Sequence, residues 1–366
     1  MERFGFVGLP NAGKSSLYNA LAGGGALAAP YAFATVDPNV GVAKVPDDRL
    51  GRLAEMSASK EVIPAAVQFV DIAGLVKGAA QGEGLGNRFL AHIREVDAIV
   101  FVLRAFADAD VPGSDDPVEQ LATLEVELVY ADLESLEKQV DKRRKAARAD
   151  SSLVDEVTAM DAAIELLQAG TPLYRGDLDA STRDLLRPFF LLTAKPALAL
   201  VNLDEAQLDD PEPVLAPVRA AFAASGGGGE GEGGQVLGLS IQLEAEAAML
   251  DEESRTEMLE ELGLGEGALP AFLHAAYRML GLRTYFTTGE KETRAWTFRA
   301  GSRAPQAAGV IHTDFERGFI RAEVVHWDEL LEAGSWSAAR DVGRLRVEGK
   351  DYEVLDGDVI EFRFNV

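Results

Sequence analysis

Eight residues near the N-terminus, Gly8 to Ser15, fit the pattern G-x-x-x-x-G-K-[ST] of a phosphate-binding loop. An apolar run from Phe4 to Val7 precedes the loop and predicts a strand, and Ser15 to Leu21 predicts a helix. In that order, backbone N–H groups and the N-terminus of the helix can surround the β-phosphate of a nucleotide. The predicted nucleotide contacts of this loop are Asn11, Ala12, Gly13, Lys14, Ser15 and Ser16.

Residues of three segments predict a catalytic Mg²⁺ site beside this loop. The Ser15 hydroxyl can bind Mg²⁺, and Lys14 can span the β- and γ-phosphates. Thr35 can complete the shell of the ion only while a γ-phosphate is present, which would make its loop a switch. Asp71 ends an apolar strand in the pattern Asp-x-x-Gly, where its carboxylate can hold Mg²⁺ through water and the Gly74 N–H can sense the γ-phosphate. We therefore predict Lys14, Thr35 and Gly74 as catalytic residues and Ser15, Thr35 and Asp71 as metal ligands.

A second strand end predicts the base-binding site. The buried-type strand from Pro196 to Val201 ends in Asn202-Leu203-Asp204-Glu205, where ligands of α/β proteins bind. A guanine-specific site needs Asn-Lys-x-Asp, but Leu203 replaces the lysine and Glu205 is one methylene longer than aspartate. We expect ATP to bind at least as tightly as GTP, and GTP stays open if Asp204 acts one position early. Predicted base-site contacts are Asn202, Leu203, Glu205 and Ser240, the last at the end of the next strand.

Composition limits the class of protein. The chain has 366 residues, no cysteine and four histidines, no two of which have metal-ligand spacing. A net charge of −25 disfavours DNA or other nucleic acid bound through bulk charge. No apolar run approaches the roughly 18–20 residues of a membrane span, and the N-terminus leads directly into the first strand. We expect a cytoplasmic protein without a targeting segment.

Two local clusters run against this acidic background. Residues 283–321 contain seven Lys or Arg and four Asp or Glu, an excess of three positive charges. A second cluster, Lys142-Arg143-Arg144-Lys145, lies at the end of a helical stretch. Each cluster is either an RNA contact or an ordinary solvated surface.

The order of patterns predicts an α/β fold of three parts. Residues 117–149 and 152–168 have helical periodicity and predict a hairpin of two helices, and short alternating strands begin at Leu282. We also expect a helix over Leu262–Arg278 and a turn at Asp314–Gly318. The predicted domains are a P-loop nucleotide-binding domain (1–118 and 188–281), an inserted helical domain (119–187) and a small C-terminal domain (282–366).

With these motifs the chain resembles the YchF/Obg-like ATPase family nearly from end to end. The residues that carry the resemblance are Gly8–Ser15, Phe33–Thr35, Asp71–Ala79, Gly82–Asn87, Asn202-x-x-Glu205, Tyr285–Glu292, Arg294–Thr297, Ala307–Asp314 and Glu348–Tyr352. The resemblance implies a P-loop G-domain, an inserted antiparallel coiled coil and a β-grasp TGS domain at the C-terminus. It also implies Mg²⁺-dependent ATP hydrolysis and association with the ribosome, which we expect on the large subunit, with RNA contacts from the coiled-coil tip and the TGS domain.

Three departures from related proteins affect catalysis or its regulation. Leu75 stands where many GTPases have a water-orienting glutamine, the loop Asp110–Gly113 lacks the histidine of many relatives, and no regulatory cysteine exists. Unstimulated turnover should then be slow, on the order of 10⁻³ to 10⁻² s⁻¹. Asn11 could supply a K⁺ ligand, as in some related GTPases, or only hydrogen-bond the loop backbone. The chain is therefore either a slow NTPase switch or a ribosome or RNA adaptor for which nucleotide is a conformational ligand.

Overall fold

The computed structural model describes residues 1–23, 40–72, 85–107, 113–223 and 235–365. Contacts within the chain divide it into two compact units, and each is described by itself. The described part of the first unit comprises residues 1–23, 40–42, 68–72, 85–107, 113–223 and 235–269, and that of the second comprises 43–67 and 270–365. The three predicted domain boundaries stay a prediction.

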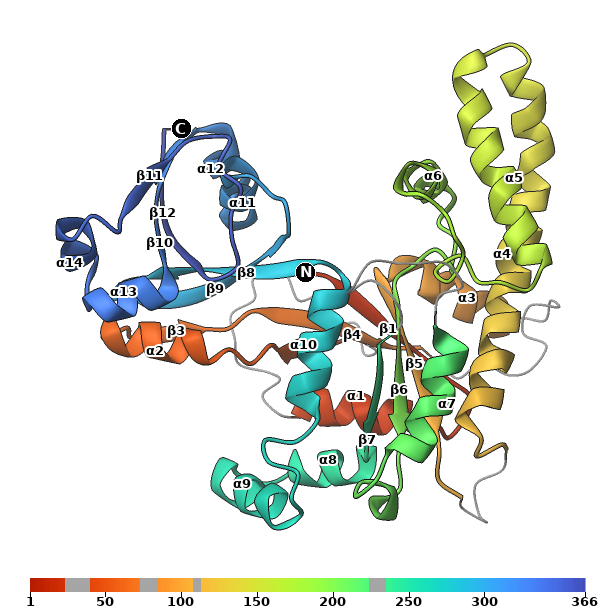
Figure 1. Ribbon diagram of the computed structural model, residues 1–366, viewed down its shortest axis with the longest axis horizontal. Helices are drawn as coiled ribbons and strands as arrows, with labels where there is room; N and C mark the ends of the chain where they lie inside the picture. Colours follow the sequence, from red (N-terminus) through yellow and green to blue (C-terminus); the bar gives the residue numbers. More distant parts are fainter. Residues whose placement is uncertain (24–39, 73–84, 108–112, 224–234, 366) are drawn as a thin grey trace. The chain divides into compact units, whose positions relative to one another are not determined.

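A six-stranded sheet forms the centre of the first unit, in the order β2-β4-β1-β5-β6-β7 (Figure 1). Strands β1, β4, β5, β6 and β7 pair in parallel, so their carboxyl ends meet at one edge of the sheet. Every residue of β5 and β6 is buried, and both strands are apolar up to their last residues, Arg104 and Asn202. The strands are β1 (Arg3–Val7), β2 (Val40–Lys44), β4 (Ala66–Asp71), β5 (Ala98–Arg104), β6 (Ala197–Asn202) and β7 (Val236–Leu239).

Helices cover this sheet and continue its core. Leu121 and Leu124 of α4 and Leu215 of α7 pack into one apolar cluster with Phe101 of β5 and Val201 of β6. The helices of the first unit are α1 (Lys14–Gly23), α3 (Leu85–Glu95), α4 (Pro117–Ala147), α5 (Val154–Gln168), α6 (Ala180–Leu186), α7 (Glu212–Phe222), α8 (Ile241–Ala247) and α9 (Glu252–Glu261).

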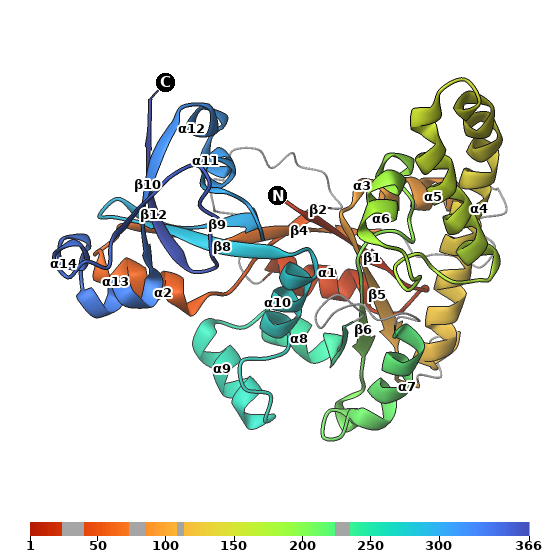
Figure 2. The ribbon, with the colours of Figure 1, turned by 45° about the horizontal axis from the view of Figure 1, so that its top comes forward.

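Helices α4 and α5 form the predicted hairpin. Asp116 caps α4 through bonds from the N–H groups of Val118 and Glu119, and Pro117 occupies the first turn. The first half of α4 packs against the sheet, and the second half packs against α5. Figures 1 and 2 show both helices extending away from the sheet of this unit.

Half of the predicted basic cluster at the hairpin tip is neutralised within the hairpin. Arg143 Nε lies 3.1 Å from Glu156 Oε1, and Arg144 Nη2 lies 2.6 Å from Asp161 Oδ1. Lys142 and Lys145 are exposed. The part of the cluster that remains for another molecule is therefore smaller than its sequence suggests.

The helix expected over Leu262–Arg278 is wrong in its first half. Helix α9 ends at Glu261, and α10 spans Leu269–Met279. Gly263, Gly265 and Gly267 have φ values of 69°, 58° and 84°. This left-handed region interrupts a right-handed helix and favours glycine.

The second unit has its own six-stranded sheet, in the order β11-β10-β12-β8-β9-β3. Its core contains Tyr285, Phe298, Ala307 and Ile360. The strands are β3 (Glu61–Ile63), β8 (Leu282–Thr288), β9 (Glu292–Arg299), β10 (Phe319–His326), β11 (Arg346–Glu348) and β12 (Asp358–Phe364). The helices are α2 (Asp48–Met56), α10, α11 (Ala304–Ile311), α12 (Thr313–Arg317), α13 (Trp327–Ala333) and α14 (Trp336–Asp341).

The turn expected at Asp314–Gly318 is instead the short helix α12. His312 caps it by accepting a hydrogen bond from the Asp314 N–H, and the Gly318 N–H donates to the Asp314 carbonyl at 2.8 Å.

Within the described ranges, none of the helices combines the length and apolar character that crossing a bilayer requires.

Candidate nucleotide-binding site

The loop between β1 and α1 has the backbone that its glycines predict. Gly13 has a φ of 105° and Asn11 a φ of 63°, both in the left-handed region. A Cβ atom on Gly8 would lie 2.5 Å from the Val102 carbonyl oxygen, and one on Gly13 would lie 2.7 Å from Nδ2 of Asn202. Only glycine fits at these two positions, so the loop lies tightly against the ends of β5 and β6.

Lys14 begins α1 and is 7% exposed. Its Nζ donates hydrogen bonds to the carbonyl oxygens of Gly8 (3.1 Å) and Leu9 (2.9 Å). Burial lowers the pKa of Lys14, and the negative charge of Asp71 acts in the opposite direction. The ammonium group is thus held over the loop, where a phosphate could replace the carbonyl oxygens as its partner.

The two predicted metal ligands in the described ranges lie together. Ser15 Oγ donates to Asp71 Oδ2 at 2.8 Å, although the residues are 56 positions apart. Because β4 is parallel to β1, its carboxyl end brings Asp71 to the start of α1. The part of the chain that the structure describes contains no group of three or more His, Asp or Glu that could hold a metal by itself. The pair therefore fits Mg²⁺ that takes its other ligands from phosphates and water. The predicted Thr35 and Gly74 lie outside the described residues.

Asn202, at the end of β6, connects three elements of the site. Its Nδ2 donates to the Ala12 carbonyl (3.2 Å), and its Oδ1 accepts from the Ile241 N–H (3.0 Å) at the start of α8. Ser240 caps the same helix by accepting from the Leu243 N–H. Both side chains are buried and bonded to the protein, so they position the loop and the edge of the sheet.

The rest of the predicted base site has a different arrangement from the one its sequence suggests. Leu203 is 2% exposed and packs in the core under β6, beside Leu215 and Gly238. Its side chain does not occupy the place of a lysine stem stacked on a base. Asp204 caps a 3₁₀ turn (Glu205–Gln207), and Glu205 is exposed at the first position of that turn. Of the two carboxylates, that of Glu205 is therefore the one not used as a helix cap.

Gln120 is a positioning residue that the sequence analysis missed. Its Oε1 accepts from the Arg104 N–H (2.9 Å), and its Nε2 donates to the carbonyl oxygens of Arg104 (2.7 Å) and Ser114 (2.9 Å). It therefore holds the end of β5 to the start of α4, beside Asn202 in the sheet register. The signal was a glutamine within the apolar stripe formed by Pro117, Leu121, Leu124 and Leu128.

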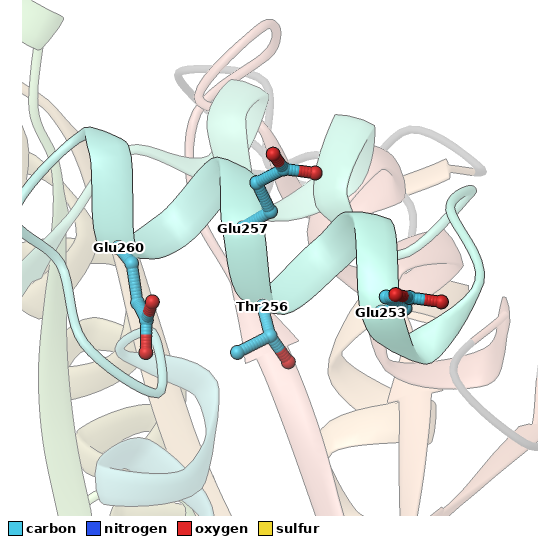
Figure 3. A pocket seen from close by; sticks show the side chains of 4 residues that line it. All are labelled: Glu253, Thr256, Glu257 and Glu260. Atoms are coloured by element: carbon cyan, nitrogen blue, oxygen red, sulfur yellow. The ribbon is translucent and has the colours of Figure 1, made fainter.

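A surface hollow of about 630 Å³ beside α9 contains no residue of the loop at Lys14 and is a poor candidate for a nucleotide site. Glu253, Thr256, Glu257 and Glu260 line it (Figure 3). The three carboxylates would repel the negatively charged phosphates of a nucleoside triphosphate. The loop at Lys14 remains the candidate site.

Two family models match the chain. Residues 3–149 match the model MMR_HSR1, described as "50S ribosome-binding GTPase". Residues 282–365 match the model YchF-GTPase_C, described as "Protein of unknown function (DUF933)".

Relatives and a solved structure match over almost the full length. "Ribosome-binding ATPase YchF" of Bacillus subtilis (strain 168) is 46% identical, with 99% of each chain covered. "Obg-like ATPase 1" of Oryza sativa subsp. japonica is 38% identical, with 100% of this chain and 92% of the relative covered. The structure of the Schizosaccharomyces pombe YchF GTPase matches with a TM-score of 0.87 and 34% identity over 99% of this chain and 97% of that one. These matches confirm the predicted α/β fold class with a P-loop domain and a further C-terminal domain.

Proposed function

Since the chain belongs to the YchF family of Obg-like ATPases, we propose that it binds ATP with Mg²⁺, hydrolyses it slowly and acts as a nucleotide-dependent switch on the ribosome. The observation that supports this best is the buried Lys14 in its glycine loop, beside the Ser15–Asp71 pair at 2.8 Å. The relatives that are named ribosome-binding ATPases support ribosome binding.

The residues of the candidate site have separate roles in this proposal. Lys14 would neutralise charge on the β- and γ-phosphates, and the loop N–H groups would orient them. Ser15 and Asp71, with Thr35 in the triphosphate state, would hold Mg²⁺, which supplies Lewis-acid stabilisation of the phosphate charge when it is bound. Gly74 would sense the γ-phosphate through its N–H.

The preference for adenine is part of the proposal. The relatives are named ATPases, whereas the solved structure is named a GTPase, so names alone do not decide the base. Glu205 is exposed where a guanine-reading aspartate is needed, and Leu203 is buried where a lysine is needed. Leu203→Lys would bury a lysine in the core and destabilise the fold, so this substitution is not a clean test of the base site.

Nucleotide titration with and without ribosomes tests the proposed function. Calorimetry should show ATP binding at least as tightly as GTP, and Glu205→Asp should shift the preference toward GTP. Turnover of ATP should rise severalfold when purified 70S ribosomes are added. Tight GTP binding with no detectable ATP binding would contradict the base assignment. Ribosome binding that is the same in wild type and in Ser15→Ala would indicate an adaptor and not a switch.

We further expect K⁺ to accelerate hydrolysis through Asn11, because a second cation could replace missing transition-state charge stabilisation. The left-handed φ of 63° offers a competing reason for asparagine, which adopts this backbone more readily than most residues. Turnover should therefore be compared in K⁺ and Na⁺ at matched ionic strength. Wild type should be faster in K⁺ by about tenfold or more.

Asn11→Gly is the sharpest variant for this test. Glycine removes the side chain and keeps the left-handed backbone, whereas Asn11→Ala adds backbone strain. The K⁺ advantage should vanish in Asn11→Gly. An equal rate in K⁺ and Na⁺ for wild type would refute K⁺ activation, and an advantage retained in Asn11→Gly would place the ion elsewhere.

A further inference from the structure

Strand β5 extends further along the sheet of the first unit than either of its neighbours, β1 and β6 (Figure 1). Strand β1 ends at Val7, opposite Phe101 of β5, and the chain continues into the phosphate loop. Strand β6 ends at Asn202, opposite Arg104, and the chain continues into the turn that carries Glu205. The end of β5 therefore lies between the two parts of the candidate site, the phosphate loop and the predicted base site.

Two glutamine side chains pair with the end of β5 where its neighbours have stopped. Backbone groups at such a place still need hydrogen-bond partners. On the side of β6, the Ala105 N–H donates to the Asn202 carbonyl oxygen (3.0 Å), and the Ala105 carbonyl oxygen accepts from Gln207 Nε2 (2.9 Å). On the side of β1, Gln120 pairs with both backbone groups of Arg104. Each carboxamide thus replaces a peptide group of a strand that has ended.

The carboxamide of Gln207 also closes the turn that follows β6. Its Oε1 accepts from the Asp204 N–H (2.8 Å), while the Gln207 N–H donates to the Asp204 carbonyl oxygen (3.0 Å). The Asp204 carboxylate caps the same turn by accepting from the Ala206 N–H (3.3 Å). One half-buried side chain therefore closes the turn and attaches it to β5, and Glu205 lies within this turn with its side chain exposed.

Capping alone does not explain a glutamine at this position. A capping box needs only an acceptor that reaches back to the backbone N–H of the cap residue, and glutamate supplies one as well as glutamine does. The bond to the Ala105 carbonyl oxygen needs a donor in addition. A glutamate would place a second acceptor against that carbonyl oxygen, so glutamine is the residue that can make both bonds.

We propose that Gln207 is a positioning residue for the nucleotide base, because it fixes the turn of Glu205 relative to the phosphate loop through the end of β5. This role rests on the proposed function, which places Glu205 at the base. Both polar atoms of the Gln207 carboxamide are bonded to the protein, so its effect on nucleotide passes through the turn. Binding groups lose affinity when they are held less precisely, and the loss here should concern the base and not the phosphates.

Gln207→Glu and Gln207→Leu test the proposal in the full chain. Glutamate keeps the acceptor for the Asp204 N–H and removes the donor to Ala105, whereas leucine removes both. The probes, measured by calorimetry with Mg²⁺, are ATP, GTP and inorganic tripolyphosphate, which has no base. We expect both nucleotides to bind about 5- to 10-fold more weakly to each variant. Tripolyphosphate should stay within about twofold of wild type for Gln207→Leu, and for Gln207→Glu it reports any repulsion by the added charge.

Gln139→Leu is the matched control. Gln139 Nε2 also donates to a backbone carbonyl oxygen, that of Ser135 (3.1 Å), but on the exposed surface of α4. The affinities of this variant for all three probes should stay within about twofold of wild type, and circular dichroism melts check that each variant is folded.

A second exchange separates positioning from a general effect on the fold. If Gln207 acts through Glu205, then Gln207→Leu should change nucleotide affinity by less than about twofold when it is added to Glu205→Ala. The full 5- to 10-fold loss in that background would overturn the assignment, because Gln207 would then act on the nucleotide by another route.

The results also distinguish this role from the proposed preference for adenine. Nucleotide affinities within twofold of wild type in both folded Gln207 variants would overturn the role. Equal weakening of nucleotides and tripolyphosphate by Gln207→Leu would overturn it as well, since the side chain would then support the phosphate loop. If wild type binds GTP tightly and ATP not at all, the proposed base preference is wrong, and the change in GTP affinity still decides whether Gln207 positions the base.

Discussion

Lys14→Met is expected to lower ATP turnover by a factor of about 10² to 10³ and to leave the fold intact. In the described part of the chain, the hydrogen bonds of Lys14 Nζ go to the Gly8 and Leu9 carbonyl oxygens. Methionine fills nearly the same space and removes the charge that would stabilise the developing phosphate charge. Single-turnover hydrolysis with saturating ATP, beside a circular dichroism melt, measures both parts of this expectation.

Lys195→Met is the matched control for this variant. Lys195 Nζ also donates to two backbone carbonyl oxygens, those of Arg94 (3.1 Å) and Val96 (2.6 Å). Burial lowers its pKa as it does for Lys14. Lys195 lies before β6, at the opposite edge of the sheet from the loop. The substitution Lys195→Met should therefore affect stability and not turnover. Comparable turnover losses in the two variants would show that Lys14 acts through folding alone.

The loop and the contact between Ser15 and Asp71 were predictable because a motif describes local structure. The spacing from Gly8 to Ser15 requires a strand, a tight turn and a helix start, and the parallel order of β4 and β1 then places Asp71 at that helix. The roles of Thr35 and Gly74 stay predictions.

The orientation of the Leu203 side chain was harder to predict. It depends on the alternation of side chains between the two faces of a strand. Asn202 points toward the phosphate loop and α8. Because successive side chains of a strand point to opposite faces, Leu203 must turn away from the loop, into the core with Val201. The residue type suggested a lost base contact, but the alternation determines where the side chain lies.

Strand β3 shows what a local pattern does not contain. Glu61–Ile63 has only three residues, none of them buried, and pairs with Glu292–Arg294, about 230 positions later. Neither its length nor its periodicity differs from a loop. The pairing depends on a long-range contact that the intervening sequence brings about.

The hydrogen bonds between α4 and the segment that precedes β6 predict a large loss of stability in Asp132→Ala. Asp132 is 1% exposed and accepts three hydrogen bonds, from the Leu192 N–H (2.9 Å), the Thr193 N–H (2.7 Å) and Thr193 Oγ1 (2.7 Å). Burial raises the pKa of Asp132, while these bonds and the charge of Arg94 act in the opposite direction. Alanine would leave three buried donors without their acceptor, so we expect the free energy of unfolding to fall by about 3–5 kcal/mol.

Asp161→Ala is the matched control, because it removes the same side chain from the same hairpin. Asp161 is 45% exposed and pairs with Arg144 on the surface, so its loss should cost about 0–1 kcal/mol. Urea unfolding gives the two values, and hydrogen exchange at the Leu192 and Thr193 amides should accelerate only in Asp132→Ala. Asp132→Asn keeps one acceptor oxygen and should lie between alanine and wild type. Equal losses for Asp132→Ala and Asp161→Ala would mean that water replaces these bonds and that they do not stabilise the contact between α4 and the segment before β6.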